Sequence, residues 1–490
     1  MTATKRTNSG DGRRGLRLSD VLRADVPAIY RALSESHGDE NSLVRRTYRL
    51  VHWLEHGGRR HVRTYLVTPL PLLWAWAADA SWAGQVHKRY LREMWRERGA
   101  LARLGLLASL LLWPPIVLAL VAWSSALNGL ATRRLVAKSI TQQVLEQIWF
   151  AGRYGILPVW YYMFEMFDPA QQRKAPHYIH RYELKSGLLQ VLRRSVPKAR
   201  RSPTRNKTAF THHCAAAGIP TIGTLALFSN GRLKGGRARQ HGLPPQDLFV
   251  KPAHGRGGEG AGLWRWTGAG YRLQDGAELA PDALMAQLAE WSRVRPLLVQ
   301  PHARNHPALA DLSNGALCTA RIVTLRNEAG GFEAVCALFR MAVGGNHLVD
   351  NFHAGGIAAP IDVASGRLGR ATDWGLRPRH GWQTHHPDTG GAIENRILPL
   401  WAETRALAER AHAAFADRHI IGWDMAILED GPHIVEANGG PDTDMHQRVS
   451  REPLGDQRFG ELFAFHLGKI AAEKFNSEGQ LVNSDNSDSV

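Results

Sequence analysis

The longest uninterrupted apolar stretch of the chain runs from Leu104 to Thr132 and contains no charged residue. Its first part, LGLLASLLLWPPIVLALVAW, spans residues 104–123, which is about the length of a helix that crosses a bilayer. Apolar side chains occur there on every side of a helix, an arrangement that suits lipid better than a one-sided protein core. Pro114 and Pro115 interrupt the stretch, and because proline removes helical hydrogen bonds we expect the helix to bend or break there. A buried core helix is the alternative interpretation.

Basic residues flank the apolar stretch on both sides, four arginines before it and three basic residues after it. Basic flanks prefer the cytoplasm, so a single span would place one flank on the wrong side. A two-span hairpin with the second apolar segment, residues 67–82, would bury Asp79 in the bilayer. We therefore expect a re-entrant or monotopic insertion at residues 104–132, at the cytoplasmic face of the bacterial inner membrane. Six tryptophans suited to an interfacial belt surround it: Trp74, Trp76, Trp82, Trp95, Trp113 and Trp123.

Residues 247–301 contain short apolar runs separated by turns, a pattern typical of strands. Leu248–Val250 predicts a strand that ends at Lys251, residues 253–262 form a glycine-rich loop, and Leu263–Trp266 resumes a strand. A strand on both sides excludes the Walker loop and the dinucleotide-binding turn, in which a helix follows the glycines. Glycine-rich backbone still approaches phosphate oxygens closely and directs N–H groups at them. Taken alone, the loop fits a bare hairpin turn equally well.

A second hairpin is predicted at residues 422–438, where two apolar strands flank an Asp-Gly turn at 429–431. Asp424 lies on the first strand. Glu436 and Asn438 lie two residues apart on the second strand, so they share one face. Carboxylate and amide oxygens are the ligands that Mg²⁺ takes, usually together with substrate phosphates. The hairpin therefore predicts a magnesium site, and a hairpin with these side chains in solvent is the alternative.

Charge divides the chain into two unlike halves. The formal net charge is +17, but residues 1–206 carry +19 and residues 207–490 carry −2. A basic front beside an apolar stretch favours an anionic membrane surface as partner, and nucleic acid is not expected because no recognition motif accompanies the charge. The three cysteines form no CxxC pair, so neither a zinc ribbon nor a disulfide framework is indicated. No apolar segment follows the basic N-terminus directly, so we expect no secretory signal there.

The glycine loop, the second hairpin and the segments around them, taken in this order, resemble the ATP-grasp superfamily. Segments 315–325, 337–369 and 420–427 narrow the likeness to the sugar-transfer-associated ATP-grasp family and, more distantly, to the ligases that glutamylate peptides. The resemblance covers roughly residues 201–470 and implies an ATP-grasp fold that binds ATP and Mg²⁺. In ligases of this superfamily ATP phosphorylates a carboxylate, an amine attacks the acyl phosphate, and phosphate leaves.

The resemblance also implies a role for each matching residue. Lys207 and Lys251 would neutralise the α- and β-phosphates, and Gln300 would lie where the hinge backbone meets adenine. Arg321 and Arg340 would face the γ-phosphate and the reacting carbonyl, and ordinary strand-end salt bridges are their alternative. The remaining positions would form the phosphate lid, a polar position near the metals, and the Mg²⁺ ligands: Gly255, Gly257, Gly258 and Gly260; Asn351; and Asp424, Glu436 and Asn438.

The sequence thus predicts an α+β protein whose ATP-grasp domain, two α+β subdomains that clasp ATP, follows a mostly helical, basic, membrane-associating region. The expected divisions are residues 1–66, 67–200, 201–475 and a disordered tail at 476–490. The predicted activity is ADP-forming ligation of an unknown carboxylate to an unknown amine, on a cell-envelope, saccharide-related or amphiphilic substrate. A phosphotransferase that acts on a hydroxyl and a non-enzymatic nucleotide-binding partner of a glycosyltransferase complex are the alternatives. The acceptor is not specified, because the helical front replaces the α/β domain that usually precedes the grasp.

Overall fold

The computed structural model of the chain describes residues 80–96, 100–194, 202–204, 206–253, 261–273, 276–345, 352, 355–376 and 381–485. All of them belong to the second of two compact units, Thr64–Val490. The expected N-terminal region 1–66 lies outside the described residues. Five predicted site residues lie outside them too: Gly255, Gly257, Gly258, Gly260 and Asn351.

A five-stranded antiparallel sheet with the order β10-β9-β8-β11-β12 forms the centre of the C-terminal half. Its strands are β8 Thr319–Arg326, β9 Phe332–Met341, β10 Ile357–Ile361, β11 Ile420–Leu428 and β12 Gly431–Asn438. β11 and β12 pair antiparallel down to Leu428 and Gly431, so the hairpin predicted there is confirmed. Gly431 has a φ of 126°, a backbone conformation that glycine adopts and other residues avoid.

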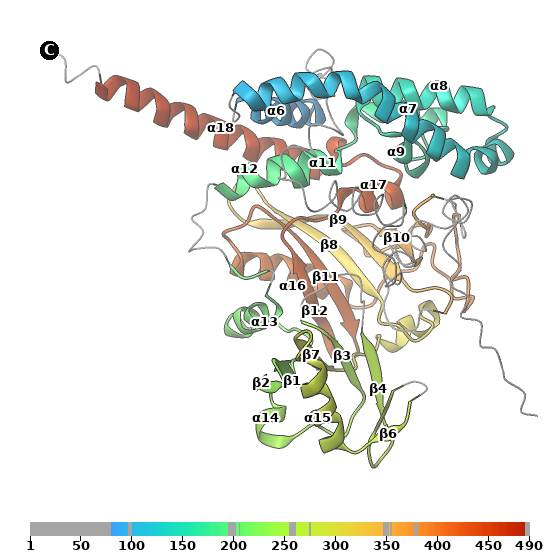
Figure 1. Cartoon of the computed structure of the whole chain (residues 1–490), viewed down its shortest axis with the longest axis vertical. Helices are drawn as coiled ribbons and strands as arrows, with labels where there is room; N and C mark the ends of the chain where they lie inside the picture. The colour runs from blue at the N-terminus through green and yellow to red at the C-terminus, as the bar shows by residue number, and fades with distance from the viewer. Residues whose placement is uncertain are drawn as a thin grey trace, which may run out of the picture. The chain divides into compact units, whose positions relative to one another are not determined.

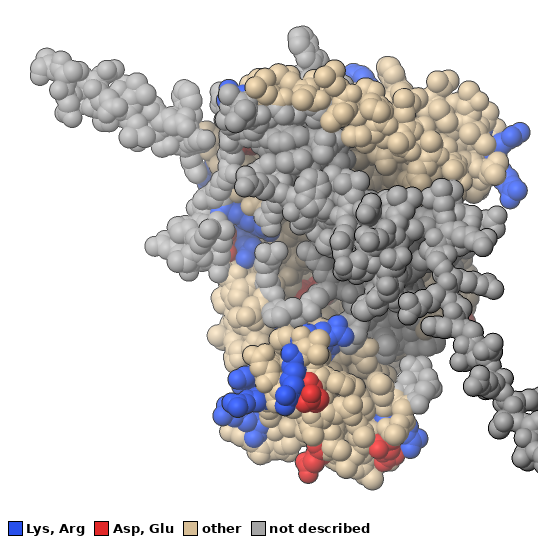
Figure 2. Space-filling model, viewed as in Figure 1, with Lys and Arg blue, Asp and Glu red and all other residues tan. Residues whose placement is uncertain are grey.

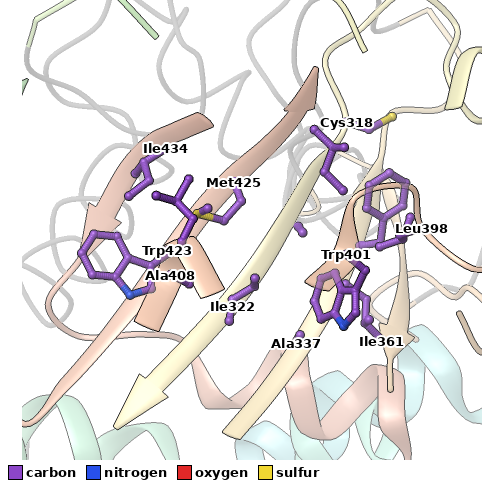
Figure 3. Close-up of a cluster of buried hydrophobic side chains, with 14 of the residues drawn as sticks. Cys318, Ile322, Ala337, Ile361, Leu398, Trp401, Ala408, Trp423, Met425 and Ile434 are labelled. Atoms are coloured by element: carbon purple, nitrogen blue, oxygen red, sulfur yellow. The ribbon is translucent and has the colours of Figure 1, made fainter. Parts of the chain in front are cut away.

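One face of this sheet is covered by helix α16, Trp401–Ala414, together with helix α13, Lys207–Ala216. Alternate side chains of the strands point to this face and are apolar, and Ile322, Phe339 and Trp423 among them are completely buried. Figure 3 shows part of this cluster, in which side chains of the sheet and of α16 pack together. The other alternate positions of the same strands therefore supply the side chains of the opposite face.

The opposite face is divided between apolar and charged side chains. Around Leu325 it packs in one hydrophobic cluster with helices α6 Trp82–Arg96, α12 Leu189–Arg194 and α18 Arg458–Asp485. α6 and α12 belong to the basic front, so helices from before residue 200 share a core with the sheet. α18 continues to Asp485, into the tail for which disorder is expected, because extending an established helix costs far less than starting one.

A second sheet has seven strands in the order β2-β1-β7-β3-β4-β5-β6. They are β1 Ala226–Ser229, β2 Arg232–Gly235, β3 Leu248–Pro252, β4 Gly262–Trp266, β5 Tyr271–Leu273, β6 Glu278–Leu279 and β7 Leu297–Pro301, with helices α14 Ala238–His241 and α15 Pro281–Trp291. β3 and β4 pair antiparallel on either side of the glycine loop, which confirms the strand–loop–strand order. In Figure 1 the five-stranded sheet lies between this subdomain and the helices of the front. The predicted architecture, two α+β subdomains behind a helical front, is therefore confirmed.

The front is helical from residue 80 on, where the structure describes it, with α7 Ala100–Val136, α8 Ile140–Tyr154, α9 Pro158–Met163, α10 Pro169–Gln172 and α11 Arg181–Glu183 following α6. α7 continues through Pro114 and Pro115, so of the bend or break that the sequence predicts, the break does not occur. A proline ring fixes φ near the helical value, and the turns on either side keep their hydrogen bonds. The helix therefore survives the loss of the two proline N–H groups.

Candidate functional site

The predicted site residues of the five-stranded sheet lie on the face away from α16. Asp424 of β11 stands opposite Arg321 of β8 on one side and opposite Glu436 of β12 on the other. Residues that stand opposite each other in an antiparallel sheet project to the same face, so these three form a row across three strands. Arg340 of β9 stands opposite Thr319, two positions before Arg321, and lies on the same face.

Asp424 accepts hydrogen bonds from Arg321 and forms an ion pair with Arg340. Arg321 donates to it through Nε and through Nη2, which lies 2.8 Å from Oδ2, and Arg340 Nη2 lies 3.0 Å from the same oxygen. Arg340 also donates to Thr319 Oγ1. Asp424, Arg321 and Arg340 are only 3%, 6% and 9% exposed. Both arginines therefore form salt bridges, as the alternative interpretation of these residues expects. Their common partner, however, is Asp424, which is also a predicted metal ligand.

The pKa values of the two carboxyl groups in the row are shifted in opposite directions. Burial favours a higher pKa for Asp424, but Arg321 and Arg340 outweigh burial and hold this pKa well below its usual range. For Glu436, burial and the neighbouring Asp424 charge raise the pKa, and the two carboxyl groups share a hydrogen bond. Of the pair, Asp424 is therefore the ionised member, and Glu436 keeps its proton to higher pH.

Two carboxyl groups that compete for one proton are a suitable place for a divalent cation. Asn438 follows Glu436 by two residues on β12, stands opposite Gly422 and lies on the same face. Mg²⁺ usually takes one or two protein carboxylates and completes its shell with substrate phosphates and water. Among the described residues there is no group of three or more His, Cys, Asp and Glu suited to a metal, so the two carboxylates and Asn438 are the candidate set.

Two predicted lysines come from two different elements, and Lys251 is the one that lies near this row. Lys207 is the first residue of α13, which Asn206 caps, and Lys251 is the fourth residue of β3 and partly buried. Burial and the charge of Lys207 lower the pKa of Lys251 to about 8, while Glu436 and Asp424 act in the opposite direction. Because such charge effects weaken with distance, Lys251 lies near both carboxylates, and Lys207 lies near Lys251. Lys207 and Lys251 precede Asp424 by 217 and 173 residues, so the fold brings together residues that are far apart in the chain.

A cleft of about 550 Å³ lies beside β7 and the β11–β12 turn, a volume in the range of small-molecule sites. Its lining consists of Thr221, Ile222, Gly223, Pro301, His302, Ala303, Arg304, Leu428, Glu429, Asp430 and His433. Gln300 is buried, and its Nε2 donates to the carbonyl of Ile222 at 2.8 Å. Gln300 therefore holds one wall of the cleft, and the backbone that follows it lines the cleft where the adenine hinge is predicted.

A second group of buried charges, which the sequence reasoning missed, lies at the start of helix α17, Thr443–Ser450. Asp442 caps this helix and also pairs with Lys185 Nζ and Arg181 Nη1, each at 3.1 Å. Both cations belong to the helical front. The front therefore contributes charged side chains beside the predicted site, which the composition of residues 1–200 did not indicate.

Asp444 and His446 extend this group toward the row. Burial, together with Asp442, raises the pKa of Asp444 to about 7. Burial and the nearby Arg321 lower the pKa of His446 to about 3. Asp444 Oδ1 and His446 Nε2 are buried and have no hydrogen-bond partner among the residues that the structure describes. The signal that would have revealed the group is the pair of aspartates in PDTD, two residues after Glu-x-Asn.

Residues 192–457, more than half of the chain, match the family model described as sugar-transfer associated ATP-grasp. Curated proteins give no match.

Solved structures that resemble the chain have low sequence identity. An N5-carboxyaminoimidazole synthase from Aspergillus clavatus, in complex with ADP and 5-aminoimadazole ribonucleotide, is 15% identical, with a TM-score of 0.27 over 52% of this chain and 54% of that one. A D-alanyl-alanine synthetase A from Vibrio cholerae is 14% identical, with a TM-score of 0.31 over 55% and 65%. A D-alanine–D-alanine ligase from Bacillus anthracis, complexed with ATP, is 10% identical, with a TM-score of 0.32 over 55% and 68%. The chain spans about half the length of the first of these proteins.

Proposed function

Because the chain belongs to the sugar-transfer-associated ATP-grasp family, we propose that it is an ATP- and Mg²⁺-dependent ligase that forms ADP. The observation that supports this most is the row of Arg340, Arg321, Asp424 and Glu436 on one sheet face, with Lys251 nearby. Phosphoryl transfer depends on positioning and charge stabilisation more than on covalent chemistry by the protein. A preorganised set of cations beside two carboxyl groups meets that need.

In the proposed reaction a carboxylate oxygen of the substrate bonds to the γ-phosphorus of ATP, ADP leaves, and an acyl phosphate forms. Lys207 and Lys251 neutralise phosphate oxygens of ATP, and Arg321 and Arg340 stabilise the negative charge of the transferred group. An amine nitrogen then bonds to the acyl carbon, phosphate leaves with the bonding electrons, and the nitrogen loses a proton. Because Asp424 fixes both guanidinium groups in advance, little reorganisation accompanies the transfer.

Asp424, Glu436 and Asn438 are the residues that would hold Mg²⁺. The ion supplies neutralisation of phosphate charge when bound. Glu436 must then give up the proton that its raised pKa favours, since a carboxyl group binds a metal in its ionised form. Asp424 is already ionised, so it would bind the cation without first losing a proton.

For the substrate we propose a saccharide-related or amphiphilic component of the cell envelope. The family's association with sugar transfer supports this class. Arg181 and Lys185 belong to the helical front and form ion pairs with Asp442, beside the row. Their position supports a role of the front in holding the acceptor. The front would then take the place of the α/β domain that precedes the grasp in related enzymes.

The test is to give the purified chain ATP, Mg²⁺ and candidate carboxylic acids, with hydroxylamine in place of the amine. We expect ADP, phosphate and a hydroxamate, because hydroxylamine traps an acyl phosphate. Lys251→Ala should abolish the product, and Lys234→Ala, at an exposed position of β2, is the matched control. Release of AMP and pyrophosphate would contradict the proposal. ADP with a phosphorylated hydroxyl compound and no hydroxamate would identify a kinase instead.

A further inference from the structure

Helix α7 exposes apolar residues and buries polar ones, which is the reverse of the arrangement usual for a helix on a protein surface. Every exposed residue described from Leu104 to Ala131 is leucine, alanine or proline. Leu111 is 80% exposed, and Leu118 and Leu130 are 53% and 58% exposed. The polar residues of the same stretch whose burial is described are all buried: Ser124, Ser125, Asn128 and, one residue further, Thr132. A helix on a protein surface in water would turn its polar residues outward.

Helix α8 packs beside α7 and hydrogen-bonds to one of these buried polar side chains, Ser125, whereas Asn128 Nδ2 donates to the carbonyl of Ser124 within α7. Gln147 Nε2 donates to Ser125 Oγ at 2.8 Å. Gln143 Nε2 donates to the carbonyl of Gly129 at 3.2 Å, and Tyr162 OH donates to Gln143 Oε1 at 3.0 Å. Helices that hold each other through polar contacts inside and present apolar side chains outside are typical of proteins in lipid.

α8 adds two large exposed apolar side chains of its own, Leu145 and Trp149, which are 63% and 61% exposed. We call the exposed residues of α7 from 104 to 131, with these two, the apolar layer. α7 is the one helix in the described part of the chain that is long and apolar enough to cross a membrane, and only 22% of its most apolar window is buried. Figure 2 shows this end of the molecule as a surface with few charged side chains, with Lys and Arg at its margin.

Charge at the edges of the apolar layer is positive. No acidic residue occurs between Glu97 and Glu146. Arg133 and Arg134 are exposed where α7 ends, and Lys138 follows and pairs with Glu146 at 2.8 Å. Cations at the border of an apolar surface match the phosphates of anionic lipids, which lie just above the acyl region.

The path of the chain argues against a single membrane crossing, because the segments before and after the apolar layer both pack against the same protein body. α6, before α7, is packed in the core of the sheet, and Arg448 of α17 donates to the carbonyl of Met163, at the end of α9, at 2.9 Å. The segment therefore leaves the protein body and returns to it. α8 has 15 residues and a length of about 22 Å, which is shorter than the hydrocarbon core of about 30 Å.

We propose that α7 and α8 form a monotopic anchor that lies in the surface of a bilayer containing anionic phospholipid. The apolar layer enters the acyl region of the cytoplasmic leaflet, and Arg133 and Arg134 contact headgroup phosphates. This inference rests on the helices alone and holds whether or not the chain is a ligase. It replaces the spanning and broken-helix interpretations with one geometry, in which both ends of the anchor stay on the protein side.

The experiment is flotation of the full chain with vesicles of phosphatidylethanolamine and phosphatidylglycerol, compared with phosphatidylcholine alone. We expect strong binding to the first and weaker binding to the second. The Leu111→Glu, Leu118→Glu double variant should lose at least about tenfold in partition, because each leucine leaves the acyl region. Val294→Glu is the matched control, since Val294 is 90% exposed on the other subdomain, and it should bind like the wild type. Arg133→Ser, Arg134→Ser should lose only the preference for anionic vesicles.

A second measurement needs no variant that alters folding. Brominated acyl chains should quench part of the wild-type tryptophan fluorescence, and the quenched part should shrink in Trp149→Phe. A wild-type chain that floats with neither vesicle and shows no quenching would overturn the proposal. So would a lipid-free dimer that Leu111→Glu, Leu118→Glu converts to monomer without any vesicle binding, because a second copy would then cover the layer. Labelling of Leu130→Cys by an impermeant maleimide from outside sealed spheroplasts would show a crossing and would also overturn it.

Discussion

Replacement of Asp424 by asparagine should destabilise the free protein, whereas replacement of the neighbouring Glu436 by glutamine should not. Asp424 is the carboxylate that compensates two buried guanidinium groups, those of Arg321 and Arg340. Asparagine has the same size but no charge, so both cations lose this partner and stay in the interior. Glu436 has a raised pKa and shares a hydrogen bond with Asp424, so glutamine resembles its protonated form.

The size of the effect follows from burial. Removing one partner of a buried ion pair costs about 3–5 kcal/mol, because the charge left behind is not solvated. Asp424, Arg321 and Arg340 are at most 9% exposed, so water does not easily replace the carboxylate. At about 2–4 °C for each kcal/mol, the melting temperature should fall by roughly 6–20 °C. For Glu436→Gln, which loses at most one hydrogen bond, we expect less than about 1.5 kcal/mol.

The assay is differential scanning calorimetry of the free chain at pH 7.5 without nucleotide or Mg²⁺. Asp311→Asn is the matched control, because it also removes a carboxylate from an arginine, Arg396, but Asp311 is 49% exposed. Exposed pairs contribute little, so this variant should melt close to the wild type. If Asp424→Asn melts as high as Asp311→Asn, or if Glu436→Gln falls as far as Asp424→Asn, the reasoning about the row is refuted.

Three further predictions concern groups in different parts of the structure. At pH 8 ATP binding should take up roughly half a proton at Lys251, whose pKa of about 8 rises beside phosphate, and calorimetry in buffers of different ionisation enthalpy should find this uptake missing in Lys251→Arg. Gly187→Ala would place a methyl group 2.6 Å from the ring of Tyr90 on α6, so the free energy of unfolding should fall by about 1–3 kcal/mol, and an unchanged urea midpoint would contradict this packing. Burial lowers the pKa of His412 to about 3, below its unfolded value of about 6.5, so its contribution is complete above pH 6.5 and is lost as the pH falls toward 3. Between pH 7 and 5 this loss is about 2 kcal/mol, and His412→Gln should show a correspondingly smaller decrease of the urea midpoint.

Much of the fold was predictable because its signals are local. The Asp-Gly turn at 429–431 and the alternation on both sides of it specify the β11–β12 hairpin, including the shared face of Glu436 and Asn438. The glycine loop between two apolar runs specifies the β3–β4 pair in the same way. Spacing within one hairpin is enough for such conclusions, because neighbouring strands fold together.

Other features depend on contacts that no local pattern reveals. Arg321 and Asp424 are 103 residues apart, and only the insertion of β11 between β8 and β12 makes them partners. The core that α6 and α12 share with the sheet is equally non-local. For α7 the two prolines predicted a bend or a break, and the sequence alone did not decide between a continuous helix and two halves at Pro114 and Pro115. Its apolar composition was visible in the sequence, but the inward position of Ser124 and Asn128 required the structure.

The most direct test of the central claim is the affinity of the chain for ATP in the presence of Mg²⁺, measured by titration calorimetry without any acceptor. If the charged row and the two lysines form the phosphate site, the wild type binds ATP and needs Mg²⁺ for full affinity. Lys251→Ala should then weaken binding by roughly tenfold to a hundredfold, the value of one charge-assisted hydrogen bond, while the exposed Lys234→Ala binds like the wild type. A wild-type chain that does not bind ATP, or a Lys251→Ala chain that binds it with unchanged affinity, would contradict the assignment.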